Sequence, residues 1–186
     1  AGKAAALRAG LQAATSDLIG FSDADLATPL EYLAELRAAI ASGGDIAIGS
    51  REGTGARRYD EPWYRHVMGR GFNLIVRALL LPDIHDTQCG FKLFRRDAIH
   101  TLLDRSLLYR TPDPVRGPRV TAFDVELLVV GRTLGYRICQ IPVSWRYGQQ
   151  SKVDPARDTW HNLRDVLQVR LNLWLGRYSP GNAQQS

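Results

Sequence analysis

The sequence predicts an α/β fold in which a mixed, mostly parallel sheet is flanked by helices. Residues 18–21 and 45–49 are short apolar runs with the character of buried strands. Between them, apolar residues recur at helical spacing from 30 to 41. Strand, helix and strand in this spacing indicate a βαβ unit, so we expect the two strands to pair in parallel through a right-handed crossover.

The other elements of the first half follow from local patterns. An alanine-rich helix is predicted at 2–14 and a polar, glycine-containing loop at 52–62. Thr28, Pro29 and Glu31 predict a capping box at the start of the 30–41 helix, and Gly43 with Gly44 predicts its end. The pattern of residues 63–81 predicts an amphipathic helix with arginines along one flank. Its apolar face either packs on the protein core or lies in a lipid interface.

The second half continues with the same alternation of elements. Strands are predicted at 90–94 and 137–145, helices at 97–103, 123–134 and 160–174, and a loop at 109–119. Pro142 predicts an edge position or a bulge for its strand. We expect a single domain at residues 1–178, followed by a disordered tail at 179–186.

Composition indicates an anionic partner. The formal net charge is +5 and the isoelectric point is about 9.5, which suits a nucleotide, an anionic membrane surface or a nucleic acid. We do not expect a nucleic acid, because the aromatic residues fall in predicted helix cores and are not interleaved with arginines on a strand. No apolar run reaches the roughly 18 residues that a membrane-spanning helix needs.

Asp23 and Asp25 follow the first predicted strand and form an Asp-x-Asp pair. Ligands of open α/β sheets bind beyond the carboxyl ends of the strands. Two neighbouring carboxylates there suit Mg²⁺ or Mn²⁺ that also binds a substrate phosphate. The alternative is an ordinary solvated turn.

Four motifs occur in a fixed order: Asp23-Ala-Asp-Leu-Ala-Thr-Pro29, Gly49-Ser-Arg51, Asp86-Thr-Gln-Cys-Gly-Phe-Lys92 and Phe123-Asp-Val-Glu126. Together they resemble the inverting glycosyltransferases of family 2, which have the GT-A (Rossmann-like) fold. The resemblance is to the dolichyl-phosphate β-glucosyltransferases and related polyprenyl-phosphate hexose synthases. It covers residues 2–152.

The resemblance implies transfer of a hexose from a nucleotide sugar to a polyprenyl phosphate at the cytoplasmic face of a membrane. It favours UDP-glucose as the donor and implies that Asp23 and Asp25 hold the metal. It places Arg51 near the donor phosphates. Because such enzymes begin with a strand that helps to hold the nucleotide, we also expect an N-terminally truncated fold that lacks its first nucleotide-binding strands.

Asp86 corresponds to an aspartate that the family places near the acceptor, where it is described as a catalytic base. A phosphate monoester has a second pKa of about 6 and is already largely ionised at neutral pH. We therefore expect Asp86 to orient the acceptor or to stabilise the sugar cation as much as to remove a proton. Its alternative role is to start a turn before Thr87.

The remaining site residues are also carried over by the resemblance. Asp124 is a second candidate catalytic residue, although carboxylates at a helix start also complement the helix dipole. Candidate substrate-binding residues are Gln88, Lys92, Glu126, Arg146, Ser151 and Lys152. Two other functions stay open: a mannose synthase that uses GDP-mannose, and a basic membrane-binding fragment without catalytic activity.

Overall fold

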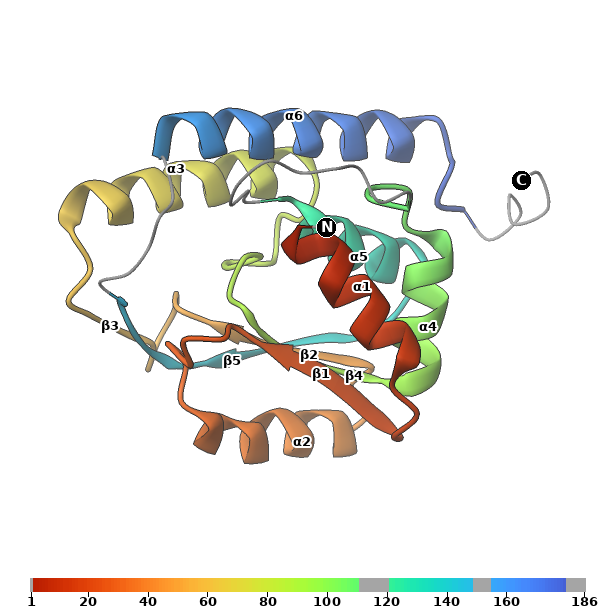
Figure 1. Ribbon diagram of the computed structural model, residues 1–186, viewed down its shortest axis with the longest axis horizontal. Coiled ribbons are helices and arrows are strands. Elements are labelled where there is room, and N and C mark those ends of the chain that lie inside the picture. The colour runs from red at the N-terminus through yellow and green to blue at the C-terminus, as the bar shows by residue number, and fades with distance from the viewer. Residues whose placement is uncertain (1, 111–120, 149–154, 180–186) are drawn as a thin grey trace.

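The computed structural model describes residues 2–110, 121–148 and 155–179 (Figure 1). The helices are α1 (Lys3–Ala13), the short 3₁₀ helix η1 (Leu30–Tyr32), α2 (Leu33–Ala41), α3 (Trp63–Leu79), α4 (Arg96–Arg105), α5 (Phe123–Thr133) and α6 (Pro155–Trp174). The strands are β1 (Leu18–Ser22), β2 (Ile46–Ser50), β3 (Arg57–Tyr59), β4 (Phe91–Arg95), β5 (Ile138–Pro142) and β6 (Ser144–Arg146). Helices therefore alternate with strands along most of the chain, as the sequence predicts.

The main sheet has the strand order β1-β4-β2-β5. Strand β4 runs antiparallel to both of its neighbours, with Phe94 opposite Ile19 on one side and Ile46 on the other. Strands β2 and β5 are parallel, so β1, β2 and β5 share one direction. The sheet is mixed as predicted, but the expected direct pairing of the first two strands is wrong because β4 inserts between them. Pro142 ends β5 at the sheet edge, which confirms its predicted position.

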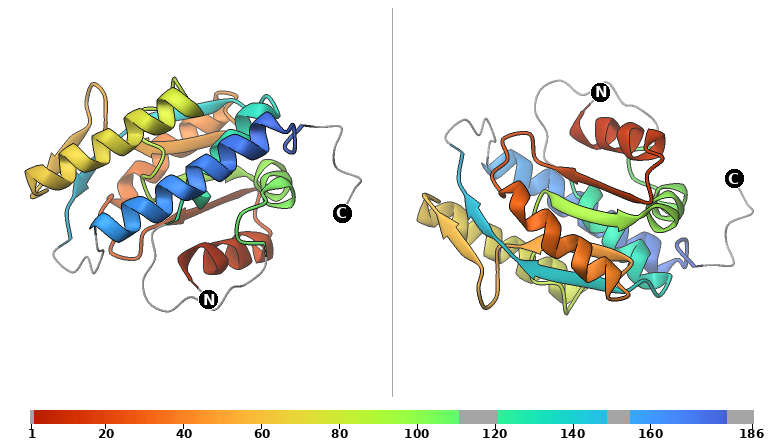
Figure 2. Two further views of the ribbon diagram at one scale, coloured as in Figure 1. Left: turned by 90° about the horizontal axis from the view of Figure 1, so that it is seen from above. Right: turned by 90° about the horizontal axis from the view of Figure 1, so that it is seen from below.

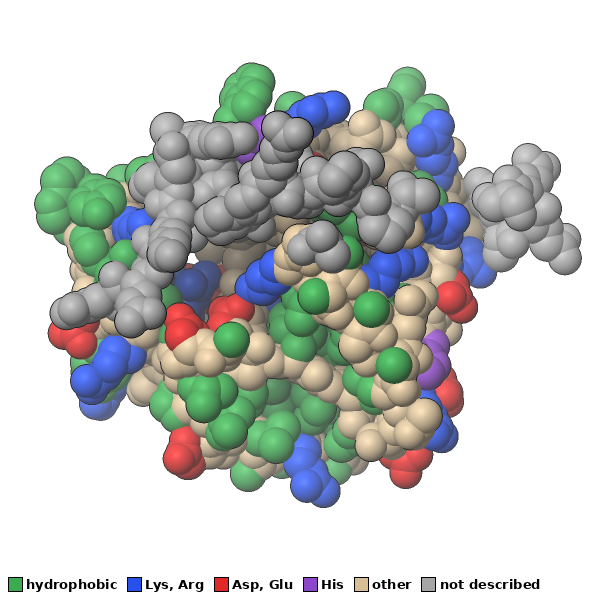
Figure 3. All heavy atoms as spheres, in the orientation of Figure 1, with side chains coloured by type: hydrophobic (Ala, Val, Ile, Leu, Met, Phe, Trp, Pro, Cys, Tyr) green, Lys and Arg blue, Asp and Glu red, His purple; other side chains and the backbone are tan. Residues whose placement is uncertain are grey.

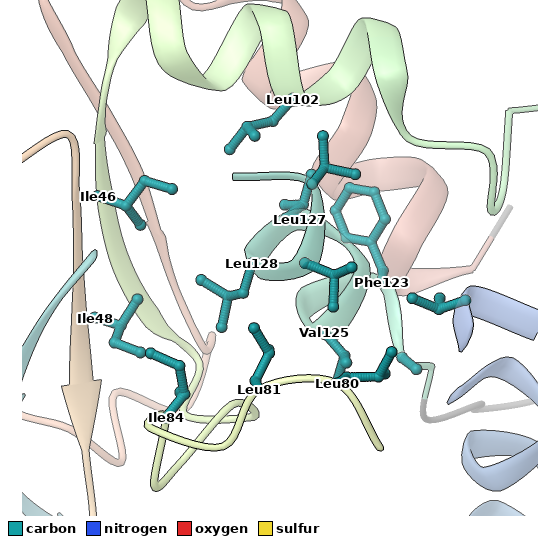
Figure 4. Close-up of a cluster of buried hydrophobic side chains, with 14 of the residues drawn as sticks. Ile46, Ile48, Leu80, Leu81, Ile84, Leu102, Phe123, Val125, Leu127 and Leu128 are labelled. Atoms are coloured by element: carbon teal, nitrogen blue, oxygen red, sulfur yellow. The ribbon is translucent and has the colours of Figure 1, made fainter. Parts of the chain in front are cut away.

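Helices cover both faces of this sheet. Helix α2 lies on one face, while α1, α4 and α5 lie on the other, with α3 and α6 beyond them (Figure 1). On the α2 side, Leu36 and Ile40 pack against apolar side chains of β2 and β4. On the other side, Ile46 and Ile48 of β2 face the buried leucines and valines of α5, as Figure 4 shows.

Two local predictions are wrong, and two others fall mostly on residues that the structure does not describe. The predicted capping box at Thr28 is wrong. Pro29 is the residue that precedes η1, and no side chain caps this helix. The Thr28 hydroxyl instead lies 3.9 Å from the Cys89 sulfur. The predicted loop at 52–62 contains β3, which pairs with β6 in a separate two-stranded sheet. Residues 111–120 and 180–186, which include most of the predicted loop at 109–119 and most of the predicted tail, lie outside the described residues.

Candidate functional site

The sheet brings the predicted motifs together at one of its edges. Because β1 and β2 share one direction, their carboxyl ends deliver Asp23 and Arg51 to the same side. Strand β4 runs the opposite way, so the segment that precedes it, including Asp86 and Gly90, arrives at this side too. Figure 3 shows acidic and basic side chains gathered around a hollow on this part of the molecule.

Asp23 and Asp25 lie at the end of a groove of about 880 Å³ between α1 and β1. The ammonium nitrogen of Lys3 lies 2.6 Å from Oδ1 of Asp23. The backbone of Gly90 flanks the same carboxylate so closely that a Cβ at this position would lie 1.9 Å from Oδ2. Oδ1 of Asp25 accepts a hydrogen bond of 3.2 Å from the backbone of Ala27. The two carboxylates are therefore held at the mouth of the groove.

The carboxylates of Asp23 and Asp25 suit a metal ion that takes its other ligands from a substrate and from water. Among the described residues, no group of three or more His, Cys, Asp or Glu side chains surrounds one point. A metal site with three or more of these side chains as ligands is therefore not present in this part of the chain. Mg²⁺ is commonly held by one or two carboxylates together with substrate phosphates and water, and Asp23 with Asp25 fits that pattern.

Asp86 is fully buried and forms a bidentate ion pair with Arg51. Nε of Arg51 lies 2.7 Å from Oδ2 of Asp86, and Nη2 lies 2.9 Å from Oδ1. The backbone nitrogens of Arg51 and Gln88 also donate to this carboxylate, at 2.9 and 3.3 Å. Burial alone would raise the pKa of Asp86, but the charge and hydrogen bonds of Arg51 outweigh it and hold that pKa well below its usual range.

This pairing changes the role expected for Asp86. Both of its oxygens are occupied by hydrogen-bond donors, and the side chain has no exposed surface with which to reach an acceptor. The Arg51 side chain remains 17% exposed and its guanidinium lies 5.3 Å from the ring centre of Trp145. In this arrangement Asp86 holds Arg51 in place, and Arg51 is the member of the pair that keeps exposed surface.

Lys92 is buried beneath the site and supports Asp124. Its ammonium nitrogen lies 3.2 Å from Oδ2 of Asp124 and also donates to the backbone oxygen of Cys89. The same group lies 5.4 Å from the ring centre of Phe21. The Lys92 side chain has no exposed surface in this arrangement, and its expected contact with a substrate stays a prediction. Asp124, at the start of α5, keeps a small exposed surface.

Glu126, another candidate substrate ligand, is bound by protein groups in this arrangement. It is fully buried, and its carboxylate accepts hydrogen bonds from the backbone nitrogens of Leu107 and Leu108 and from the hydroxyl of Tyr178. Burial raises the pKa of Glu126 above its usual value, although these hydrogen bonds oppose the shift. Glu126 therefore joins the α4–α5 region to the segment after α6.

Four candidate substrate-binding residues remain, and the structure describes only two of them, Gln88 and Arg146. Gln88 is half-buried and touches Asp86 through its backbone nitrogen. Arg146 is exposed, and its guanidinium lies 5.7 Å from the ring centre of Tyr59. Ser151 and Lys152 lie outside the described residues.

Two residues of the site were missed by sequence reasoning. Lys3 precedes Asp23 by 20 positions and sits in an alanine-rich helix with no functional pattern. Trp145 was read only as part of a strand, but it stacks on Arg51. A signal for Lys3 did exist, because it is one of only three lysines in a chain whose basic residues are nearly all arginine.

Helices α3 and α6 lie side by side (Figures 1 and 2). Both helices expose large apolar side chains. Trp63 at the start of α3 is 78% exposed, and Trp160 and Trp174 of α6 are 68% and 77% exposed. Leu74 on α3 and Leu167 on α6 add to this surface. None of the helices in the described part of the chain is long and apolar enough to span a bilayer.

Comparison with known proteins gives consistent results. Residues 1–103 match the family described as glycosyl transferase family 2. The chain is 36% identical over 158 residues to the glycosyltransferase AglD of Haloferax volcanii, which covers 84% of this chain and 24% of that protein. It is 30% identical to the human dolichyl-phosphate beta-glucosyltransferase, covering 95% of this chain and 54% of the relative. The chain thus spans about half or less of the length of these relatives.

Proposed function

The chain belongs to glycosyl transferase family 2, and from this premise we propose that it acts in the transfer of glucose from UDP-glucose to a polyprenyl phosphate such as dolichyl phosphate. The observation that carries the proposal is the meeting of Asp23, Asp25 and Arg51 at one edge of the sheet. The names of the relatives support the acceptor, since several are dolichyl-phosphate beta-glucosyltransferases.

The reaction forms a bond between an acceptor phosphate oxygen and the anomeric carbon, and it breaks the bond from that carbon to the nucleotide diphosphate. Attack from the face opposite the leaving group inverts the configuration of the sugar. When bound at Asp23 and Asp25, Mg²⁺ or Mn²⁺ would neutralise charge on the departing diphosphate. Arg51 supplies a second, fixed positive charge for a phosphate oxygen.

The burial of Asp86 is compatible with this chemistry. An acceptor phosphate with a second pKa of about 6 arrives as an anion, so its attack needs no base. Asp86 instead holds the guanidinium of Arg51 in place through two side-chain hydrogen bonds. We assign Asp124, which keeps a small exposed surface at the start of α5, to the sugar hydroxyls, and Lys92 fixes its position through their ion pair.

We propose peripheral attachment to the cytoplasmic face of an anionic membrane, and the exposed side chains of α3 and α6 support the attachment itself. Tryptophan rings favour the interface between headgroups and acyl chains, and exposed Trp63, Trp160 and Trp174 offer three of them. Arg70 on α3 and Arg164 and Arg170 on α6 are exposed and suit anionic headgroups. A polyprenyl phosphate embedded in the membrane would then be presented to the site.

The test is transfer of radiolabel from UDP-glucose to dolichyl phosphate in liposomes, with Mn²⁺ and with EDTA. We expect labelled lipid with Mn²⁺ from the chain and loss of product in Asp23→Asn. Higher transfer from GDP-mannose would replace the proposed donor. Flotation with anionic liposomes but no metal-dependent UDP binding would instead favour the non-catalytic membrane-binding fragment.

A further inference from the structure

Lys3 and Lys92 are both paired with site carboxylates, but only one of them is free to move. The Lys92 side chain has no exposed surface and is fixed between Asp124 and the backbone of Cys89. The Lys3 side chain is 53% exposed and reaches Asp23 from the first turn of α1. Lysine has a flexible stem, so an exposed lysine changes partners at little cost.

The partner of Lys3 is the carboxylate that the proposed metal needs. One oxygen of Asp23, Oδ1, is already bound to the Lys3 ammonium at 2.6 Å. The carboxylate has little room to turn away, because the backbone of Gly90 lies directly against it. The charges of Asp25 and Asp124 also act on Lys3. A divalent cation at Asp23 therefore meets a positive charge on the same group and is repelled by it.

We propose that Lys3 is a movable counter-ion that makes metal binding depend on the nucleotide diphosphate. The inference rests on the proposed function, because it takes Asp23 and Asp25 as the metal ligands. With metal alone, Lys3 competes for Asp23 and weakens the complex. A diphosphate beside the metal gives Lys3 a second anionic partner, so the ammonium leaves Asp23 and binds a phosphate oxygen. Metal and nucleotide then strengthen the binding of each other by the same factor.

The test measures free Mn²⁺ by electron paramagnetic resonance with the whole chain, alone and with saturating UDP. For the unaltered chain we expect weak binding of Mn²⁺ alone and clearly tighter binding with UDP. Lys3→Gln should bind Mn²⁺ alone about two- to fivefold more tightly, the range expected for one partly exposed ion pair. In the same variant, UDP should enhance Mn²⁺ binding less, and UDP binding in EDTA should weaken.

Two further variants separate the specific role of Lys3 from a general change of charge. Lys3→Arg keeps the cation and should retain most of the enhancement by UDP. Arg96→Gln removes one positive charge from a similar exposed pair, with Asp17 at the other end of β1, and should leave both Mn²⁺ affinities unchanged. Circular dichroism checks that each variant is folded.

The outcomes distinguish the inference from the function on which it rests. Unchanged Mn²⁺ affinities in folded Lys3→Gln, alone and with UDP, would overturn the role of Lys3 and leave the metal site standing. The same holds if Arg96→Gln shifts them as much as Lys3→Gln does. Failure of the unaltered chain to bind Mn²⁺ even with UDP would refute the metal site itself, and the counter-ion with it.

Discussion

Asp86→Asn tests whether the buried aspartate stabilises the fold by holding Arg51. The change keeps the shape of the side chain but removes the charge beneath a guanidinium that is only 17% exposed. It also turns an amide group, which donates hydrogen bonds, toward the Arg51 donors at Nε and Nη2. Breaking a buried ion pair by removing one partner costs about 3–5 kcal/mol of unfolding free energy. Because Arg51 keeps some contact with water, we expect the lower value, about 3 kcal/mol.

The assay is urea unfolding followed by circular dichroism, with thermal unfolding as a second measurement. A loss of about 3 kcal/mol corresponds to a fall in Tm of roughly 6–12 °C for a chain of this size. The matched control is Asp83→Asn, which breaks an exposed pair with Arg132 and should cost less than about 1 kcal/mol. Adding Arg51→Met to Asp86→Asn removes the unpaired charge and should recover part of the loss.

The dependence on pH gives an independent check. The pKa of Asp86 is held below its unfolded value of about 3.9, so its stabilising effect is complete above that value and is lost as the pH falls through the lower, folded pKa. The difference between the unaltered chain and Asp86→Asn should therefore shrink as the pH falls from about 5 toward 3 and below. A difference under about 1 kcal/mol at pH 7, or one that does not change with pH, would refute the reasoning.

Further variants at three positions test other parts of the structure. Gly90→Ala should reduce binding of Mn²⁺ in the presence of UDP, because its Cβ would lie 1.9 Å from the Asp23 carboxylate and force that group to move. Glu126→Ala should cost about 3 kcal/mol in urea unfolding, since it leaves two backbone N–H groups and a tyrosine hydroxyl without their partner, whereas Glu126→Gln should cost about 1 kcal/mol. Trp160→Ser should reduce flotation with anionic liposomes, because it removes an exposed ring from the α3–α6 surface.

Each of these variants has a matched comparison. Gly69 stands in α3 with nothing within 4 Å of an added Cβ, so Gly69→Ala should keep Mn²⁺ binding and gain about 0.5–1 kcal/mol of stability. Equal losses in the two Glu126 variants would contradict the assigned hydrogen bonds. Leu30 is 50% exposed in η1, away from α3 and α6, so Leu30→Ser should not affect flotation. A similar loss in both variants would indicate nonspecific adsorption.

The sequence predicted the elements better than their arrangement in the sheet. Periodicity is a local signal, and it located both α2 and β2 with small errors at their ends. Sheet order depends on contacts between distant segments. Strand β4, from Phe91 to Arg95, inserts between β1 and β2, and nothing in the spacing of residues 18–49 indicates this insertion. The short strand β3 escaped notice for a related reason, since its partner β6 lies more than 80 residues later.

The sequence predicted where the candidate site residues lie in the fold, but it did not predict which of them are buried or which groups they contact. Asp23 and Arg51 follow β1 and β2, which run in the same direction, so both lie at the same end of these strands. That a ligand binds beyond this end stays a prediction. Motif positions could not show which carboxylates face solvent. Asp86 and Glu126 both belong to motifs, yet both are fully buried and bind protein groups. Their partners come from other elements, so this distinction depends on tertiary packing.

The balance of charge in the site explains why a divalent cation suits it. Three cations are each paired with one carboxylate: Lys3 with Asp23, Arg51 with Asp86, and Lys92 with Asp124. Asp25 is the fourth carboxylate, so the formal charges of these seven described side chains sum to −1 where a diphosphate would arrive. An anionic substrate is repelled by that charge, whereas a bound divalent cation would convert it to +1. The pairs of Arg51 with Asp86 and of Lys92 with Asp124 are each neutral overall, so they leave this sum unchanged, although the guanidinium of Arg51 still offers a local positive charge to a phosphate. Of the three cations, Lys3 has the most exposed side chain, so it is the one that is able to leave its carboxylate and bind a phosphate of the substrate.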